Sequence, residues 1–294
     1  MNRLAAPVIA LFFLSAGAWT QTHEGDRAQG TPVVTAVAVC GNKTTAREII
    51  LRELTIGVGD TVDDAEIMYS QERIYSLGLF NRVRIAYPPV DSTTLIVDVE
   101  ERWYVYPVPL FGSVERDIRR WYYGIGVKHD NFRGWNEKVF AGFVLGGNPW
   151  AGFAYSNPWV FRRGDLSLET SAWYRRIDNK SAIARAGGPN FHETHYTGDL
   201  TVGKRFGLFH KLWFGVGFQY VEVSDKRPGR TIAPGGIDRS LWVRAGFQRD
   251  TRNLAEYPTS GMYGTVSLAR QGVGFGDADM FVAAADLRVY RSVT

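Results

Sequence analysis

The sequence predicts an α+β domain followed by an antiparallel transmembrane β-barrel, and three observations support this fold class. Helical periodicity occurs only before residue 103, whereas alternating apolar and polar segments occupy the rest of the chain. Glycine and aromatic residues are abundant, with 32 Gly, 9 Trp, 14 Tyr and 17 Phe. After the N-terminal region no segment approaches the roughly 20 consecutive apolar residues of a spanning helix, which excludes a helical membrane protein.

The N-terminus carries the features of a secretion signal. Arg3 precedes an apolar run over residues 4–15, and Ala16-Gly17-Ala18 then forms a small-residue cleavage pattern. We therefore predict a signal peptide at residues 1–18 and a flexible lead-in at residues 19–30; a buried N-terminal helix is the alternative. The net charge of +4 comes from scattered Lys and Arg residues, so the sequence predicts no nucleic-acid partner.

The predicted α+β domain spans residues 31–102. Alternating apolar residues predict strands at residues 33–39, 81–87 and 94–101. Cys40 is the single cysteine, so an intrachain disulfide is excluded. We interpret Cys40 as a small buried thiol that ends the first strand.

Two helices are predicted between the first and second strands of this domain. Thr45 and Glu48 form a capping box, which predicts a helix over residues 45–54. Asp63 repeats the start signal for a second helix, and Gly78 provides its stop. The predicted order is therefore strand, helix, helix, strand, strand.

Ten alternating segments follow, and turn-forming residues separate them. They cover about residues 103–110, 121–129, 137–146, 150–157, 165–176, 194–204, 211–223, 239–249, 261–270 and 278–290. A soluble sandwich would bury the apolar face of such strands, whereas a membrane barrel turns that face to lipid and lines a wet lumen with polar side chains. In the membrane interpretation Glu169, Arg244, Asp286 and Arg288 face the lumen, and outer-membrane lipids contact the apolar face.

Aromatic residues near the segment ends favour the membrane interpretation. Trp103, Trp121, Trp150, Trp173 and Tyr290 lie within a few residues of a segment end. Amphipathic rings gather in this way at the two surfaces of a bilayer. Together with the signal peptide, they predict a transmembrane barrel.

Three motifs occur in this second region in a fixed order. They are Asp130-Asn131-Phe132-Arg133-Gly134, Tyr155-Ser156-Asn157-Pro158-Trp159, and Asp250-Thr251-Arg252-Asn253 followed by Tyr257-Pro258-Thr259-Ser260-Gly261. With the Leu-Gly-Leu-Phe turn at residues 77–80, they resemble the superfamily of BamA, TamA and the two-partner secretion translocators. That superfamily pairs periplasmic POTRA domains with a sixteen-stranded outer-membrane β-barrel.

The resemblance implies that residues 31–102 form one POTRA domain and that residues 103–294 form the N-terminal part of the barrel. About ten of sixteen strands are then present, so we expect the chain to be truncated. The family's Arg-Gly-Phe loop would follow Thr294; Phe132-Arg133-Gly134-Trp135 lies at an early turn and is not that loop. This chain has one POTRA domain, whereas BamA has several. Periplasmic accessory proteins that bind this domain are a further expected class of partner.

The resemblance also implies a client-binding site, because the second strand of a POTRA domain lies at a sheet edge. The residues of this strand are Arg82, Val83, Arg84, Ile85, Ala86 and Tyr87. An exposed edge accepts an extended client segment by strand addition, and Arg82 and Arg84 discourage unselective pairing. The alternative is that the apolar residues only pack the domain while the arginines solvate it.

The first barrel strand is the second candidate site, because in the family the first and last strands form a lateral seam that opens to template an incoming strand. The seam residues are Tyr104, Val105, Tyr106, Pro107, Val108 and Pro109. Proline has no N–H to donate, so Pro107 and Pro109 favour a weakly paired edge strand. They also fit a plain linker between the two domains.

These features predict an outer-membrane protein, with its POTRA domain in the periplasm, that inserts or translocates unfolded outer-membrane or secreted client proteins by strand templating. The alternative function is a passive pore or receptor with a POTRA-like scaffold. No catalytic residue, cofactor or metal is predicted, because the sequence lacks a G-x-S-x-G elbow, a P-loop and a dinucleotide-binding glycine motif. His192 and His195 have no cluster of carboxylates or thiols to complete a metal site.

Overall fold

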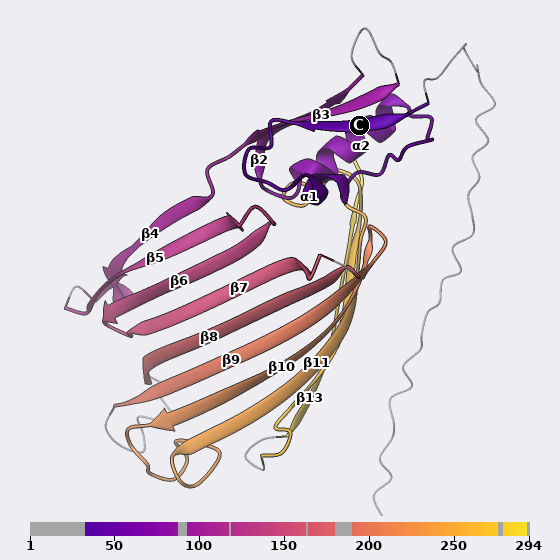
Figure 1. The fold of residues 1–294 in the computed structure, drawn as a ribbon. Helices are drawn as coiled ribbons and strands as arrows, with labels where there is room; N and C mark the ends of the chain where they lie inside the picture. Colours follow the sequence, from indigo (N-terminus) through magenta and orange to yellow (C-terminus); the bar gives the residue numbers. More distant parts are fainter. Residues whose placement is uncertain are drawn as a thin grey trace, which may run out of the picture. The chain divides into compact units, whose positions relative to one another are not determined.

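A computed structural model of the protein describes residues 33–87, 93–117, 119–162, 164–179, 190–275 and 279–292. These residues form a three-stranded sheet with two helices and a separate ten-stranded sheet (Figure 1). The predicted signal peptide and lead-in lie outside the described residues, as does the turn at residues 88–92. No helix in the described ranges is long and apolar enough to span a bilayer.

The first sheet and its helices confirm the predicted α+β domain and its element order. The elements are β1 (Ala36–Cys40), α1 (Arg47–Leu51), α2 (Asp64–Tyr75), β2 (Phe80–Ala86) and β3 (Thr94–Glu101). The strand order is β1-β3-β2, with β1 parallel and β2 antiparallel to β3. Ile49, Ile50, Ile74, Leu95 and Val97 belong to a buried core between helices and sheet, so β1 and β2 form the two edges of the sheet.

The two helices begin differently. Asp63 caps α2 as predicted, because its carboxylate accepts a hydrogen bond from the Glu66 N–H at 2.7 Å. The capping box predicted for α1 is wrong: Ala46 is the N-cap, no side chain caps the helix, and Thr45 makes its hydrogen bonds elsewhere. Cys40 ends β1, but it is exposed and not buried as predicted.

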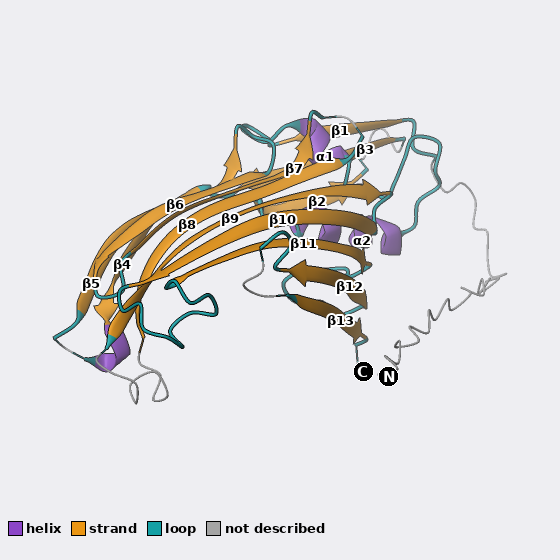
Figure 2. Cartoon of the chain, turned by 90° about the horizontal axis from the view of Figure 1, so that it is seen from below, coloured by secondary structure: helices purple, strands orange, loops and turns teal. Residues whose placement is uncertain are grey.

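The ten segments predicted after residue 103 correspond one by one to strands of the large sheet. They are β4 (Val105–Ser113), β5 (Trp121–Phe132), β6 (Glu137–Gly146), β7 (Trp150–Val160), β8 (Leu166–Asn179), β9 (Phe191–Phe206), β10 (His210–Val223), β11 (Ile237–Asp250), β12 (Gly261–Gln271) and β13 (Met280–Tyr290). Each strand pairs antiparallel with its neighbour in sequence. A 3₁₀ helix, η1 (Val114–Arg116), follows β4. Within the described residues β4 and β13 have one strand neighbour each, so they bound an open, curved sheet (Figure 2).

The register of the large sheet separates a polar face from an apolar face. Glu169 and Arg244, two of the predicted lumen residues, lie on one face of the sheet. The register connects them through the pairs Glu169–Thr201, Thr201–Gly215 and Gly215–Arg244. Asp286 and Arg288 lie on the same face through their pairing with β12. The other face carries exposed apolar side chains such as Val202, Phe214, Phe247, Leu268 and Val289. We call these the polar face and the apolar face.

Glycines on the polar face make room for large aromatic rings from neighbouring strands. A Cβ atom added to Gly152 would lie 2.0 Å from Trp173 Cε3, and one added to Gly217 would lie 2.2 Å from Trp242 Cζ2. Gly246 has the same relation to Trp213, at 2.4 Å. Because a side chain at these positions would collide with the ring, glycine allows the ring to lie flat against the strand. At these three positions glycine and tryptophan therefore depend on each other for packing.

We expect Gly152→Ala to destabilise the sheet by about 1–3 kcal/mol, since the added methyl group must displace the Trp173 ring or the strand. Gly198→Ala is the matched control, because a Cβ atom there meets only the Ser171 carbonyl oxygen, at 3.8 Å. The measurement is the urea midpoint of tryptophan fluorescence for the detergent-folded protein. Equal midpoints for the two variants would contradict the packing argument.

Candidate functional site

The free edge of β2 is the first part of the candidate site. Val83 and Ile85 are buried, whereas Arg82, Arg84 and Ala86 are exposed, as the alternation predicts. Arg82 also lies 3.5 Å from the Glu100 carboxylate on β3. The arginines therefore lie on the outer face of the sheet, and the edge itself consists of main chain.

Hydrogen bonds reveal which main-chain groups of β2 point away from the sheet. Beyond a register shift near Arg82, Arg84 pairs with Asp98 and Ile85 with Val97. The Ile85 N–H donates to Gln71 Oε1 on α2 at 3.2 Å, so it is directed outward and not toward β3. Alternate residues of an antiparallel strand direct their main-chain groups to the same side, so Val83 is also directed outward.

The first strand of the large sheet is the second part of the candidate site, and the first of its predicted residues, Tyr104, lies just before β4. Tyr104 is only 9% exposed and belongs to the buried core of the α+β domain. Its hydroxyl donates to the Leu79 carbonyl at 3.1 Å and lies 3.1 Å from Thr45 Oγ1. The phenol is thus held in that core, and Tyr104 precedes β4 and is not part of its free edge.

The prolines of β4 occupy the positions that face away from the sheet. The Asp130 N–H donates to the Tyr104 carbonyl at 2.9 Å, and Tyr106 pairs with Lys128 in the same register. Even-numbered residues of β4 therefore direct their main-chain groups to β5, and Pro107 and Pro109 are directed to the free side. Because both prolines face away from β5, their missing N–H groups do not weaken the pairing with β5. The outer edge keeps its carbonyl acceptors but lacks two N–H donors.

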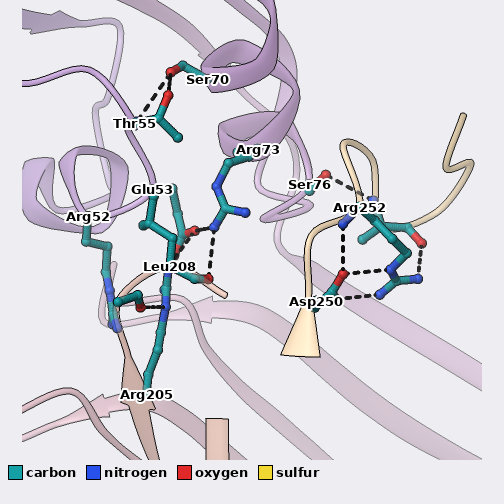
Figure 3. A network of polar contacts seen from close by, with 12 residues as sticks. Arg52, Glu53, Thr55, Ser70, Arg73, Ser76, Arg205, Leu208, Asp250 and Arg252 are labelled. Carbon is teal, nitrogen blue, oxygen red and sulfur yellow. Dashed lines mark hydrogen bonds and ion pairs between the residues drawn. The ribbon is translucent and has the colours of Figure 1, made fainter. Parts of the chain in front are cut away.

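A buried carboxylate joins the α+β domain to the large sheet, and this junction is the third part of the site (Figure 3). Glu53 accepts a hydrogen bond from Arg73 of α2 at 2.7 Å and two from Arg205 of β9, one of them at 3.0 Å. Beside it, Arg52 pairs with Asp165 at 3.2 Å and stacks over the Trp159 ring at 4.7 Å. Burial lowers the pKa of Arg52, although the charge of Glu53 opposes this effect.

The three sequence motifs of the large sheet all contribute to this junction. Asn131, from the first motif, is fully buried and donates to Thr45 Oγ1 at 2.9 Å. Trp159, from the second, is the ring beneath Arg52. Asn253, from the third, donates to Glu72 Oε1 on α2 at 3.3 Å and accepts from the Ser76 hydroxyl at 3.4 Å. The motifs therefore mark the ends of β5 and β7 and the loop after β11, all of which contact the α+β domain.

Glu101 organises the domain's side of the junction. Its carboxylate accepts hydrogen bonds from the N–H groups of Thr44, at 3.0 Å, and Thr45, at 2.6 Å. Burial raises the pKa of the Glu101 carboxyl, but the bonds from Thr45 and Thr44 outweigh it and hold the pKa below its usual range. The charged carboxylate therefore fixes the segment that presents Thr45 to Asn131.

Sequence reasoning missed Glu53, Arg73, Arg205 and Gln71. Glu53 and Arg205 are 152 residues apart, and neither belongs to a motif with recognisable spacing. His192 and His195 lie on β9, where His195 is 3.0 Å from Glu193. In the described ranges no group of three or more His, Cys, Asp or Glu side chains is placed to hold a metal ion.

Comparison with known families decides the identity of these two parts. The model of the Omp85 superfamily domain matches residues 131–294, and the POTRA model, described as a surface antigen variable number repeat, matches residues 32–102. The chain belongs to the Omp85 superfamily. The α+β domain is accordingly a POTRA domain, and the protein resides in the bacterial outer membrane with this domain in the periplasm.

Of three similar solved structures, the first shares the fold with a TM-score above 0.5. The crystal structure of BamA from Haemophilus ducreyi lacking POTRA domains 1–3 has a TM-score of 0.53 at 18% identity, covering 83% of this chain and 49% of that one. CdiB from Acinetobacter baumannii has a TM-score of 0.46 at 13% identity over 87% of this chain and 48% of that one. CdiB from Escherichia coli has a TM-score of 0.45, also at 13% identity, with coverages of 84% and 46%. The chain thus spans about half the length of these structures, and no curated protein sequence matches it.

We expect Glu53→Ala to loosen the POTRA domain from the sheet, because Arg73 and Arg205 would lose their shared carboxylate. Hydrogen bonds to charged groups contribute about 1.5–3 kcal/mol each, so the docked population should fall more than about tenfold relative to the undocked one. Spin labels on the exposed Cys40 and on a Gly235→Cys substitution should then give a broader distance distribution. Glu48→Ala, an exposed position on α1, is the control; a broadening of equal size there would refute the role of Glu53.

Proposed function

We propose that this Omp85 protein inserts or secretes other proteins at the outer membrane, without chemical catalysis, by pairing its strand edges with extended client segments. The superfamily includes the outer-membrane assembly and secretion proteins BamA and CdiB. The observation that carries the proposal is the free edge of β2, where Val83 and Ile85 direct main-chain groups away from the sheet. Such an edge binds by main-chain hydrogen bonds and therefore accepts many sequences.

At β2, an unfolded outer-membrane or secreted client would add a further strand to the POTRA sheet. Each main-chain hydrogen bond contributes about 0.5–1.5 kcal/mol net, so a short paired segment is held weakly and reversibly. Arg82 and Arg84 project from the outer face of the sheet and keep the edge soluble when it is empty. Weak, sequence-tolerant binding suits a protein that must hand its client on.

At β4, we propose that the absent donors of Pro107 and Pro109 keep the first strand easy to open. A strand paired there would lose two hydrogen bonds relative to a complete ladder, about 1–3 kcal/mol in total. Each main-chain group without a hydrogen-bond partner costs free energy in lipid. An unpaired edge that lacks two N–H donors therefore has a lower cost than a complete edge. The seam would thus exchange one strand for another at low cost.

The proposed mechanism uses neither a cofactor nor a metal nor a catalytic residue. Its partners are the client strand, the outer-membrane lipids that meet the apolar face, and periplasmic accessory proteins that bind the POTRA domain. Glu169, Arg244, Asp286 and Arg288 would line a watery lumen, where Lys211 lies 3.0 Å from Glu169 and Arg244 lies 3.6 Å from Asp199.

That charged face also supports a second candidate function, a passive pore or receptor with the POTRA domain as a scaffold. Such a pore would need the polar face but neither of the two strand edges. The two functions therefore differ in whether β2 contacts unfolded proteins.

We expect a photo-crosslinker placed at Arg84, on β2, to capture an unfolded outer-membrane protein diluted from urea onto the full chain in detergent. The same crosslinker at Ala36, on the opposite edge strand β1, is the matched control, since both positions are exposed. Capture at Arg84 several-fold above Ala36 supports strand addition at β2. Equal capture at both positions, or none, favours the passive pore.

For β4, we expect the double substitution Pro107→Val with Pro109→Val to slow the release of a bound strand peptide about tenfold, because it restores two N–H donors at the edge. Release is followed by chasing a labelled peptide with unlabelled peptide and crosslinking at Val105. Phe111→Leu, on the same side of the strand but without a change of donor, should leave release unchanged. Identical release from the double variant would show that this edge does not template strands.

A further inference from the structure

We propose that Gln71 is a gate on the β2 edge, and that a client strand must displace its side chain before it can pair with Ile85. This inference rests on the proposed client binding at β2 and adds the residue that controls it. Without a client, the outward Ile85 N–H donates a hydrogen bond to the Gln71 amide oxygen at 3.2 Å. A client strand needs that same donor, because Val83 and Ile85 are the residues of β2 whose main-chain groups point outward.

The position of Gln71 on α2 explains how one side chain can cover a strand edge. Ser70 and Ile74 face the POTRA core, and Arg73 reaches Glu53 at the junction. At about 100° per residue, Gln71 lies on the helix flank opposite Arg73. The contact with Ile85 shows that this flank overhangs the free edge of β2.

The same flank carries two exposed apolar side chains. Met68 is 58% exposed and Tyr75 is 45% exposed, and with Gln71 they follow the spacing i, i+3 and i+7 that places residues on one helix face. A strand paired with β2 would run beneath this flank. Its side chains on that side would meet Met68 and Tyr75, so the surface fits an extended segment with apolar residues at alternate positions.

Gln71 makes binding selective because the exchange of hydrogen bonds is close to neutral. The Ile85 N–H has a partner before and after the client pairs, so that bond contributes little net free energy. The favourable free energy must then come from other contacts, chiefly apolar side chains against Met68 and Tyr75. An alternating amphipathic strand can supply these contacts, whereas a uniformly polar segment cannot.

Two substitutions at Gln71 should change client binding in opposite directions. Gln71→Ala removes the competing acceptor and should tighten binding about fivefold. Gln71→Glu keeps the acceptor and adds a negative charge that strengthens its hydrogen bond, so it should weaken binding by a similar factor. Both replacements are good helix formers, which keeps α2 intact.

The test uses the full chain in detergent and a synthetic peptide with alternating valine and threonine, with an all-serine and glycine peptide as the polar control. Affinity is measured by fluorescence anisotropy, and hydrogen–deuterium exchange is followed for residues 80–87. In Gln71→Ala without peptide, exchange of this segment should rise by about one amide, and the valine–threonine peptide should reverse the rise. The polar peptide should bind Gln71→Ala with higher affinity than it binds the wild type.

The outcomes separate the gate from the proposed function. Opposite shifts in affinity for the two variants support the gate. If the peptide binds the wild type and both variants equally, or binds Gln71→Ala more weakly, the gate is wrong while client binding at β2 stands. If no variant binds the peptide and the Arg84 crosslinker captures no client, client binding at β2 is wrong and the gate is wrong with it.

Discussion

Main-chain hydrogen bonding at strand edges is the constraint on which the rest of this structure depends. Interior strands satisfy their N–H and C=O groups in the ladder, but an edge strand must leave them to water, a side chain or another strand. The two candidate edges differ in what happens to their outward N–H donors. In β4, two outward donors are absent because Pro107 and Pro109 replace them, and in β2 the outward donor of Ile85 is covered by Gln71.

The large sheet is organised by a second constraint, which is that its two faces meet different surroundings. The register places Glu169, Arg244, Asp286 and Arg288 together on one face, while large apolar side chains occupy the other. Glycines beneath aromatic rings then let the polar face carry large groups without forcing neighbouring strands apart. This separation of faces is the pattern typical of outer-membrane strands, whose apolar side chains meet lipid.

The sequence was sufficient to predict the elements that depend on local periodicity, and insufficient for those that depend on distant partners. All ten strands of the large sheet followed from alternation and turn residues, and the cap of α2 followed from Asp63. The α1 cap failed because the Thr45 hydroxyl bonds to Asn131, 86 residues away. The burial of Tyr104 depends on a distant partner too, since Leu79, which accepts its hydrogen bond, is 25 residues away.

The candidate site was predicted only in outline. Alternation identified the exposed arginines of β2, and the prolines identified β4, but neither pattern shows which way a main-chain donor points. That direction became evident only from the Gln71–Ile85 and Asp130–Tyr104 hydrogen bonds. The junction could not be predicted at all, because Glu53 has no sequence feature that distinguishes a buried carboxylate from a solvated one.

Helix α2 connects the parts of the site, since its two flanks serve different neighbours. On one flank Arg73 shares Glu53 with Arg205 of the sheet, and on the other Gln71 contacts the β2 edge. A helix of 12 residues held by a buried core moves as a unit. Arg73 and Gln71 lie two residues apart on this helix, so the junction and the β2 edge both depend on where the POTRA core holds α2.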